Sequence, residues 1–262
     1  MQLKMYQVDA FASKLFSGNP AAVVILESPL PDDLMQSIAS ENNLSETAFI
    51  NINKKPITIR WFTPTIEVAL CGHATMASAK VLFEYFADIS GNEIIFSSKS
   101  GVLKVTKLSD DICLNFPSDY PQPQKMDAVI SDALGESPRK ILKGTDDFLT
   151  VFDNEQQIRA MSPDFMKLSK INSRGVVITA PGDNVDFVSR CFFPQTGVDE
   201  DPVTGSAHTM LIPYWAKQLG KMELKARQLS TRGGSLVCKL ENDRVLISGK
   251  SVIYLEGIIS II

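Results

Sequence analysis

The sequence predicts an α+β protein made of two pseudo-symmetric domains, because strand-like runs outnumber helical ones and the chain contains a long internal repeat. The first copy reads Arg-Trp-Phe-Thr-Pro at 60–64 and Cys-Gly-His-Ala at 71–74. The second copy reads Arg-Cys-Phe-Phe-Pro at 190–194 and Thr-Gly-Ser-Ala at 204–207. Solenoid repeats have periods of roughly 20–50 residues, so this much longer period indicates two copies of a whole domain.

Strands are expected wherever short runs rich in Val, Ile and Phe lie between turn residues. In the first half these runs are 2–8, 21–25, 47–51, 57–62, 93–97, 102–107 and 111–116. The second half repeats the order with 175–179, 186–193, 234–240 and 244–248. Each half is therefore expected to be mostly antiparallel sheet.

Helices are expected at 31–39 and 74–86, and again at 162–168 and 206–219. The segment 74–79 has small or apolar residues on every side, which is typical of a fully buried helix. Each domain is thus predicted to wrap a β-barrel-like sheet around a central helix. We expect a linker at 117–125, and hence domains at 1–118 and 119–262, and we leave open that the last strand crosses back to the first domain.

Composition excludes several classes of protein. The 262 residues are 44% hydrophobic and 21% charged, with a net charge of −4, which gives no reason to expect nucleic acid or an anionic membrane as a partner. No apolar run approaches the roughly 20 residues of a membrane helix, and the N-terminus lacks an apolar signal core. The four scattered cysteines are expected to be reduced in a cytoplasmic protein.

Metal and nucleotide sites receive little support from the sequence. There are only two histidines, with no cluster at metal-ligand spacing and no glycine-rich nucleotide loop after a strand. An enzyme with this sequence is therefore expected to work with no metal and no cofactor.

The two glycine junctions are candidate binding elements. Gly72 and Gly205 each stand at the start of an apolar helix, where backbone N–H groups are unpaired and the helix dipole is positive. Two such starts, with Ser206, could hold a carboxylate between them across a cleft. The alternative is a pair of ordinary helix caps, with Ser206 capping its own helix.

Glu46 is the candidate proton carrier. It opens a strand in the first half, and the corresponding segment 173–177 carries no acid. An acid present in one copy only fits a proton-transfer role in an asymmetric site. The alternative is a surface or hydrogen-bonded glutamate.

Three further side chains flank the junctions. Asp201 precedes Pro202, which holds it extended and could aim its carboxylate at the next helix start, although a turn aspartate is the alternative. His73 is expected to be neutral because the helix dipole would lower its pKa; the alternative is a capping or core histidine. Cys71 could act as a thiolate base, but its counterpart Thr204 excludes a two-thiol mechanism, and an inert buried cysteine is the simpler interpretation.

Taken together, these motifs resemble the PhzF-like isomerases related to phenazine biosynthesis, within the diaminopimelate epimerase-like fold. The resemblance implies two similar domains with the active site between them, usually in a homodimer, and isomerisation without a cofactor. It makes Glu46 the catalytic glutamate, His73, Asp201 and Ser206 its supporting residues, and Gly72 and Gly205 the lining of the carboxylate site. The segments that carry it are 8–11, 18–23, 43–49, 60–64, 70–75 and 200–208.

The sequence thus predicts a cytoplasmic isomerase that moves a proton within a small cyclic carboxylate through Glu46. Two alternatives stay open: a racemase or epimerase with Cys71 as its single thiol, and a non-catalytic protein that binds a small acid.

Overall fold

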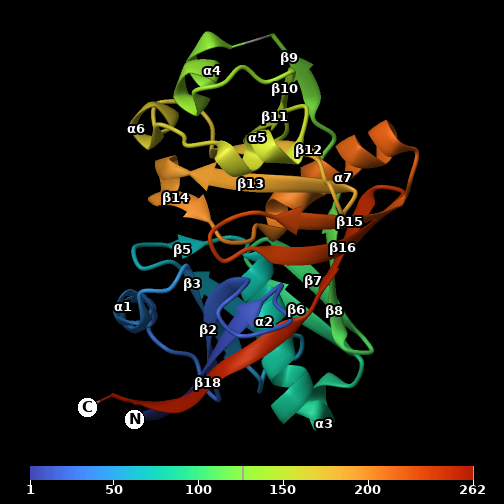
Figure 1. Cartoon of the computed structure of the whole chain (residues 1–262). Coiled ribbons are helices and arrows are strands. Elements are labelled where there is room, and N and C mark those ends of the chain that lie inside the picture. Colours follow the sequence, from blue (N-terminus) through green and yellow to red (C-terminus); the bar gives the residue numbers. More distant parts are fainter. Residues whose placement is uncertain (126, 262) are drawn as a thin grey trace. The chain divides into compact units, whose positions relative to one another are not determined.

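A computed structural model describes residues 1–125 and 127–261 (Figure 1). The chain divides into two compact units. Unit 1 comprises Met1–Asn115 and Ser248–Ile262, and unit 2 comprises Phe116–Ile247. Both units contain strands and helices, so the predicted α+β class is confirmed.

Unit 1 contains these elements, of which β8 continues two residues into unit 2: β1 (Gln2–Ala10), β2 (Asn19–Leu26), α1 (Asp32–Asn42), β3 (Glu46–Asn51), β4 (Ile57–Phe62), β5 (Glu67–Val68), α2 (Gly72–Tyr85), α3 (Ala87–Ser90), β6 (Glu93–Ser98), β7 (Gly101–Leu108), β8 (Asp111–Pro117) and β18 (Ser251–Ser260). The remaining elements are β9 (Gln122–Gln124), α4 (Ala128–Leu134), β10 (Lys140–Lys143), β11 (Asp147–Val151), α5 (Glu155–Ala160), α6 (Phe165–Leu168), β12 (Gly175–Pro181), β13 (Phe187–Phe193), the 3₁₀ turn η1 (Pro194–Thr196), β14 (Val198–Asp201), α7 (Gly205–Leu219), β15 (Glu223–Gln228), β16 (Gly234–Glu241) and β17 (Arg244–Gly249).

The sheet of unit 1 is mixed, with antiparallel pairs predominating. Strand β1 pairs antiparallel with β2 on one side and with β18 on the other. The pairs β2–β3 and β4–β6 are parallel. Parallel neighbours need a crossover connection, and helices α1 and α2 supply it.

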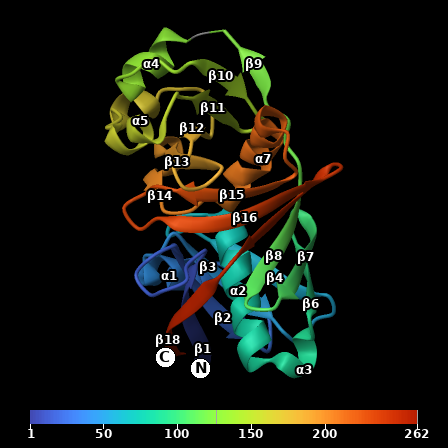
Figure 2. The same cartoon turned by 45° about the vertical axis from the view of Figure 1, so that its right-hand side comes forward.

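Helix α2 is packed against strands β1, β2, β3, β7 and β18 of unit 1 (Figures 1 and 2). Eleven of its fourteen residues are buried, which agrees with the small and apolar residues on all its sides. The predicted start at residue 74 is two residues late, because the helix already includes Gly72 and His73. Closure of the sheet around this helix as a barrel stays a prediction.

Unit 2 repeats the order of pairings found in unit 1. The pair β11–β12 is parallel, β12–β13 antiparallel and β13–β15 parallel, as β2–β3, β3–β4 and β4–β6 are. Helix α7 occupies the place of α2 in this order and packs against β11, β15 and β16. Its buried residues include His208 and Trp215, and Trp215 donates to Thr179 Oγ1 at 2.9 Å.

Two segments of unit 2 differ in part from their sequence predictions. The proline-rich segment expected to be a linker contains strand β9, in which Pro123 pairs with Leu142 of β10. Proline is tolerated on a strand that needs no N–H donor at that position. The helix expected at 162–168 is only the short α6, and the better-defined helix is α5, which begins with an Asn154–Gln157 capping box.

Within the described residues, no helix combines the length and apolar character required to cross a membrane.

Candidate active site

Both helix starts singled out in the sequence lack a side-chain cap. Helix α2 follows Cys71, and α7 follows Thr204; both residues are extended, and neither forms a side-chain cap hydrogen bond. Ser206 lies inside the first turn of α7, so the alternative that it caps its own helix is wrong. The backbone N–H groups of both first turns therefore keep the character of anion-binding groups.

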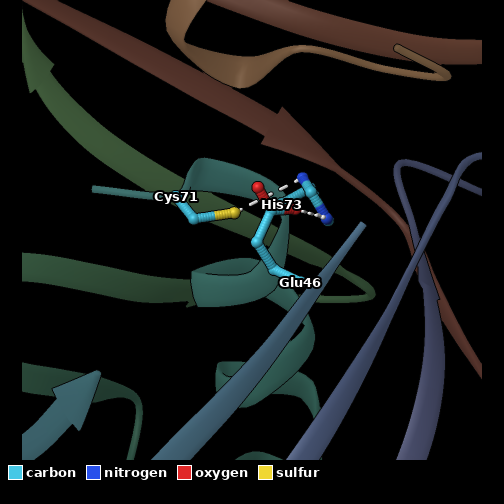
Figure 3. Close-up of side chains that lie close together, drawn as sticks. All are labelled: Glu46, Cys71 and His73. Carbon is cyan, nitrogen blue, oxygen red and sulfur yellow. Dashed lines mark hydrogen bonds and ion pairs between the residues drawn. The ribbon is translucent and has the colours of Figure 1, made fainter. Parts of the chain in front are cut away.

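Unit 1 brings together three of the side chains discussed above (Figure 3). Glu46 opens β3, and its Oε2 atom lies 3.1 Å from Nε2 of His73 in the first turn of α2. Neither atom has a hydrogen-bond partner among the described residues, so the contact is a close ion pair and not an aligned hydrogen bond. The Cys71 Sγ atom lies 3.5 Å from the other ring nitrogen, Nδ1.

Asn19 completes this group and was missed at the sequence level. Its side-chain amide lies 3.1 Å from His73 Nδ1, and both residues are buried. Asn19 opens β2, which pairs with β3, so the sheet brings it to Glu46 and the start of α2. Its place in the Gly18-Asn19-Pro20 segment was the available signal.

The environment of His73 favours its charged form. Burial lowers the pKa of His73, whereas the Glu46 carboxylate beside the ring raises it, and the resulting pKa lies well above the usual value. The expectation of a neutral His73 is therefore wrong. A full negative charge at 3.1 Å outweighs the partial positive charge of a helix start.

Cys71 is a thiol and not a thiolate at neutral pH. Burial and the nearby Glu46 carboxylate raise its pKa to about 11, although His73 acts in the opposite direction. Thiolate is the reactive form of cysteine, so this environment favours the inert interpretation of Cys71 over the thiol-base alternative.

The same three side chains are of types that bind metal ions, and one potential ligand atom from each lies within 4.8 Å of the others. The sequence did not reveal this grouping, because Glu46 is far from the other two along the chain. However, Glu46 approaches Nε2 and Cys71 approaches Nδ1, whereas one ion takes a single nitrogen from an imidazole. This arrangement is better suited to exchanging protons than to coordinating one ion.

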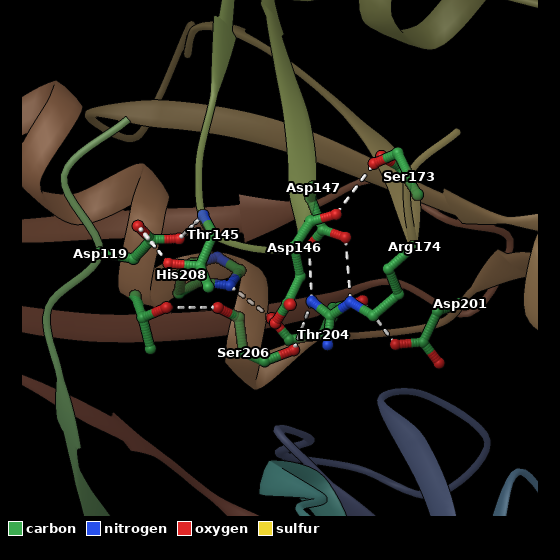
Figure 4. Close-up of polar contacts among 12 residues, drawn as sticks. Asp119, Thr145, Asp146, Asp147, Ser173, Arg174, Asp201, Thr204, Ser206 and His208 are labelled. Carbon is green, nitrogen blue, oxygen red and sulfur yellow. Dashed lines mark hydrogen bonds and ion pairs between the residues drawn. The ribbon is translucent and has the colours of Figure 1, made fainter. Parts of the chain in front are cut away.

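Unit 2 places Asp201 beside the start of α7 (Figure 4). Thr204 Oγ1 donates to Asp201 Oδ2 at 2.5 Å, in the direction that the Asp201-Pro202 pair predicted. The fully buried Gln228 accepts from the Thr204 N–H at 2.9 Å and donates to the Asp201 carbonyl at 2.8 Å. Gln228 thereby fixes this junction, and no local sequence signal marked it.

Ser206 has a partner that sequence reasoning also missed. Arg174 Nη2 donates to Ser206 Oγ at 3.2 Å and to the buried Asp147 (Figure 4). His208 belongs to the interior: its Nδ1 lies 2.8 Å from the Thr204 carbonyl, and burial lowers its pKa to about 4.

The predicted site residues thus form two groups. Glu46, Gly72 and His73 lie together in unit 1, and Asp201, Gly205 and Ser206 lie together in unit 2. That the two groups share one site stays a prediction.

Comparison with known proteins gives a consistent result over almost the whole chain. Residues 8–257 match the family model described as phenazine biosynthesis-like protein. An uncharacterized isomerase of Pseudomonas aeruginosa is 51% identical over 98% of both chains. The crystal structure of a PhzF-family phenazine biosynthesis protein of Enterococcus faecalis superposes with a TM-score of 0.96 at 44% identity, covering 100% of both chains.

A more distant structure shares the fold only. The hydroxyproline epimerase of Agrobacterium vitis, solved with bound trans-4-hydroxy-L-proline, gives a TM-score of 0.66 at 11% identity and covers 98% of this chain and 91% of its own.

Proposed function

Because this chain is an isomerase that belongs to the phenazine biosynthesis-like protein family, we propose that it moves a proton within a small cyclic carboxylate, without a cofactor, through Glu46. The observation that carries the proposal is the Glu46–His73 pair at 3.1 Å beside the uncapped start of α2. This is the place in unit 1 where a proton-exchanging carboxylate and anion-binding N–H groups adjoin.

The proposed reaction needs no net change of oxidation state. Glu46 takes a proton from an activated carbon, and the electron pair of the C–H bond moves into the adjacent π system. Glu46 then returns the proton to another carbon on the same face of the substrate. General acid–base catalysis of this kind contributes typically about 10²–10⁴-fold.

The other predicted site residues have supporting roles in this proposal. His73 and Asp201 position an amine or hydroxyl of the substrate and stabilise developing charge. Ser206 and the N–H groups of the helix starts bind the carboxylate, and Gly72 and Gly205 leave room for its approach.

We further propose that the two units act as two pseudo-symmetric domains, each a curved sheet around its central helix, with the first boundary near the predicted residue 118 and the last strand, β18, belonging to the first domain. The shared order of strand pairings and the burial of α2 and α7 support this. A cytoplasmic location and a homodimer stay predictions.

The test is exchange of carbon-bound hydrogen in deuterated water. Purified protein is incubated with small ring carboxylates that carry a C=C bond beside a C–H bond, beginning with cyclohex-2-ene-1-carboxylate, and deuterium in the carbon positions is measured by mass spectrometry. Exchange by the wild type and by Glu84→Gln, but not by Glu46→Gln, is expected; Glu84 is a half-exposed glutamate of α2 paired with Lys80. Undiminished exchange by Glu46→Gln would refute the assignment.

The same assay addresses the alternative of a Cys71 racemase. Cys71→Ala should leave exchange nearly unchanged under the proposed mechanism and should abolish it under a thiol mechanism. The elevated pKa of Cys71, about 11, favours the first outcome.

A further inference from the structure

Strand register gives unit 2 a cation close to the position where unit 1 has its carboxylate. In the parallel pair β2–β3, Glu46 lies opposite Ala21. In the parallel pair β11–β12, which has the same place in unit 2, Gly175 lies opposite Asp147. The residue adjoining Gly175 is Arg174.

The side chains at these two strand starts make corresponding contacts. Glu46 approaches His73 in the first turn of α2, and Arg174 donates to Ser206 in the first turn of α7. The two junctions therefore differ in charge: unit 1 presents an acid to its helix start, and unit 2 presents a guanidinium.

Arg174 is held in a defined orientation. Its Nε donates to Asp147 Oδ1 at 2.9 Å, and its Nη2 donates to Asp147 Oδ2. Asp147 is 4% exposed, and the guanidinium stands 5.3 Å from the centre of the Phe193 ring. A side-on pair with a buried carboxylate and a flanking ring restrict the guanidinium before any ligand arrives.

In this orientation one nitrogen of the Arg174 guanidinium, Nη1, can donate to a ligand. The contacts with Asp147 and Ser206 engage Nε and Nη2, while Nη1 has no hydrogen-bond partner among the described residues. The Arg174 side chain is 36% exposed, so solvent or a ligand can reach it. A fixed guanidinium with free N–H groups suits planar anions such as carboxylates.

We propose that Arg174 is a substrate-binding and specificity residue: Nη1 donates to the carboxylate of the substrate, while Nη2 holds the Ser206 hydroxyl in place. The inference rests on the proposed function and names the group that selects an anionic over a neutral substrate. It assigns the charge discrimination to unit 2 and the proton transfer to unit 1.

The test compares two planar ring ligands that differ in charge, pyrrole-2-carboxylate and pyrrole-2-carboxamide, by isothermal titration calorimetry. Arg174→Met should weaken carboxylate binding by about 10–100-fold, the range for losing a hydrogen bond to a charged group, and should leave carboxamide binding within about threefold. Arg174→Lys should recover part of the affinity, because it keeps the charge but loses the planar fork. Asp147→Asn retains Arg174 but loses the side-on pair that orients it, so carboxylate binding should weaken by less than in Arg174→Met.

Arg190→Met is the matched control, because Arg190 also forms a side-on pair with a carboxylate of unit 2, that of Glu200. It should lower stability without changing the affinity for pyrrole-2-carboxylate. If Arg174→Met is too unstable to purify, Arg174→Lys and Asp147→Asn provide the comparison.

The proposal is overturned by unchanged carboxylate affinity on replacement of Arg174, by an equal loss for both ligands, or by a wild type that binds neither at millimolar concentration. Glu46→Gln separates the two hypotheses: it should bind pyrrole-2-carboxylate normally and fail to exchange deuterium. Loss of exchange in Glu46→Gln, together with an unchanged carboxylate affinity in Arg174→Met, would therefore refute the inference and leave the proposed function standing.

Discussion

Shortening the proposed proton carrier tests geometry separately from charge. Glu46→Asp keeps the carboxylate but withdraws it by roughly 1.5 Å, the length of one C–C bond. The contact with His73, now 3.1 Å, would lengthen by up to that amount, and the distance to a bound carbon would change similarly. A misplacement of about 1 Å can cost about 10²-fold in rate, so kcat should fall by about that factor.

The assay is the initial rate of deuterium incorporation as a function of substrate concentration, followed by NMR for whichever ring carboxylate the wild type exchanges. Because Glu46 is not proposed to bind the carboxylate of the substrate, KM should change little. Thermal unfolding should remain close to that of the wild type, since the side chain is 18% exposed and the variant keeps its charge. Wild-type kcat in Glu46→Asp, or a loss confined to KM, would refute the positioning argument.

Three other outcomes follow from the structure. Iodoacetamide should alkylate Cys71 slowly at pH 7–8 in the native protein and faster as the pH approaches its pKa of about 11; rapid reaction at neutral pH would contradict the burial of the thiol. The stability that protonated His73 contributes should be full below its unfolded pKa of about 6.5 and should be lost as pH rises through its higher folded pKa. The difference in unfolding free energy between wild type and His73→Asn, measured in urea, should therefore shrink towards alkaline pH. A difference that grows with pH would show that folding lowers the pKa of His73 instead of raising it. Asn154→Ala, which removes the capping box of α5, should cost about 1 kcal/mol in the same assay, while a change near zero would show that the cap contributes little.

The buried helices were the most predictable part of the fold. Small and apolar residues after Gly72 and Gly205 define α2 and α7, and their observed starts lie within two residues of the predicted ones. The segment around Pro123 was misread because proline is a local signal, whereas its pairing with β10 is decided by a distant partner. Helix α4, in the same region, had no strong periodicity to reveal it.

The residues of the site could be named from the sequence, but the contacts between their side chains could not. Glu46 and His73 could be named from their positions, yet only the sheet brings residues 27 positions apart into contact. The charge state of His73 was mispredicted for this reason, since the helix dipole was visible in the sequence and the carboxylate beside the ring was not. Arg174 escaped notice because it contacts Ser206, which lies 32 positions away along the chain.

The last strand gives this protein a particular order of assembly. Strand β18 pairs with β1 from Gln2 to Ala10, and the terminal amine donates to the Ile261 carbonyl at 2.6 Å. During synthesis β1 therefore keeps one edge unpaired until β18 has been made. Unit 2 is one continuous segment between the two segments of unit 1, so unit 1 cannot be completed until unit 2 has been synthesised.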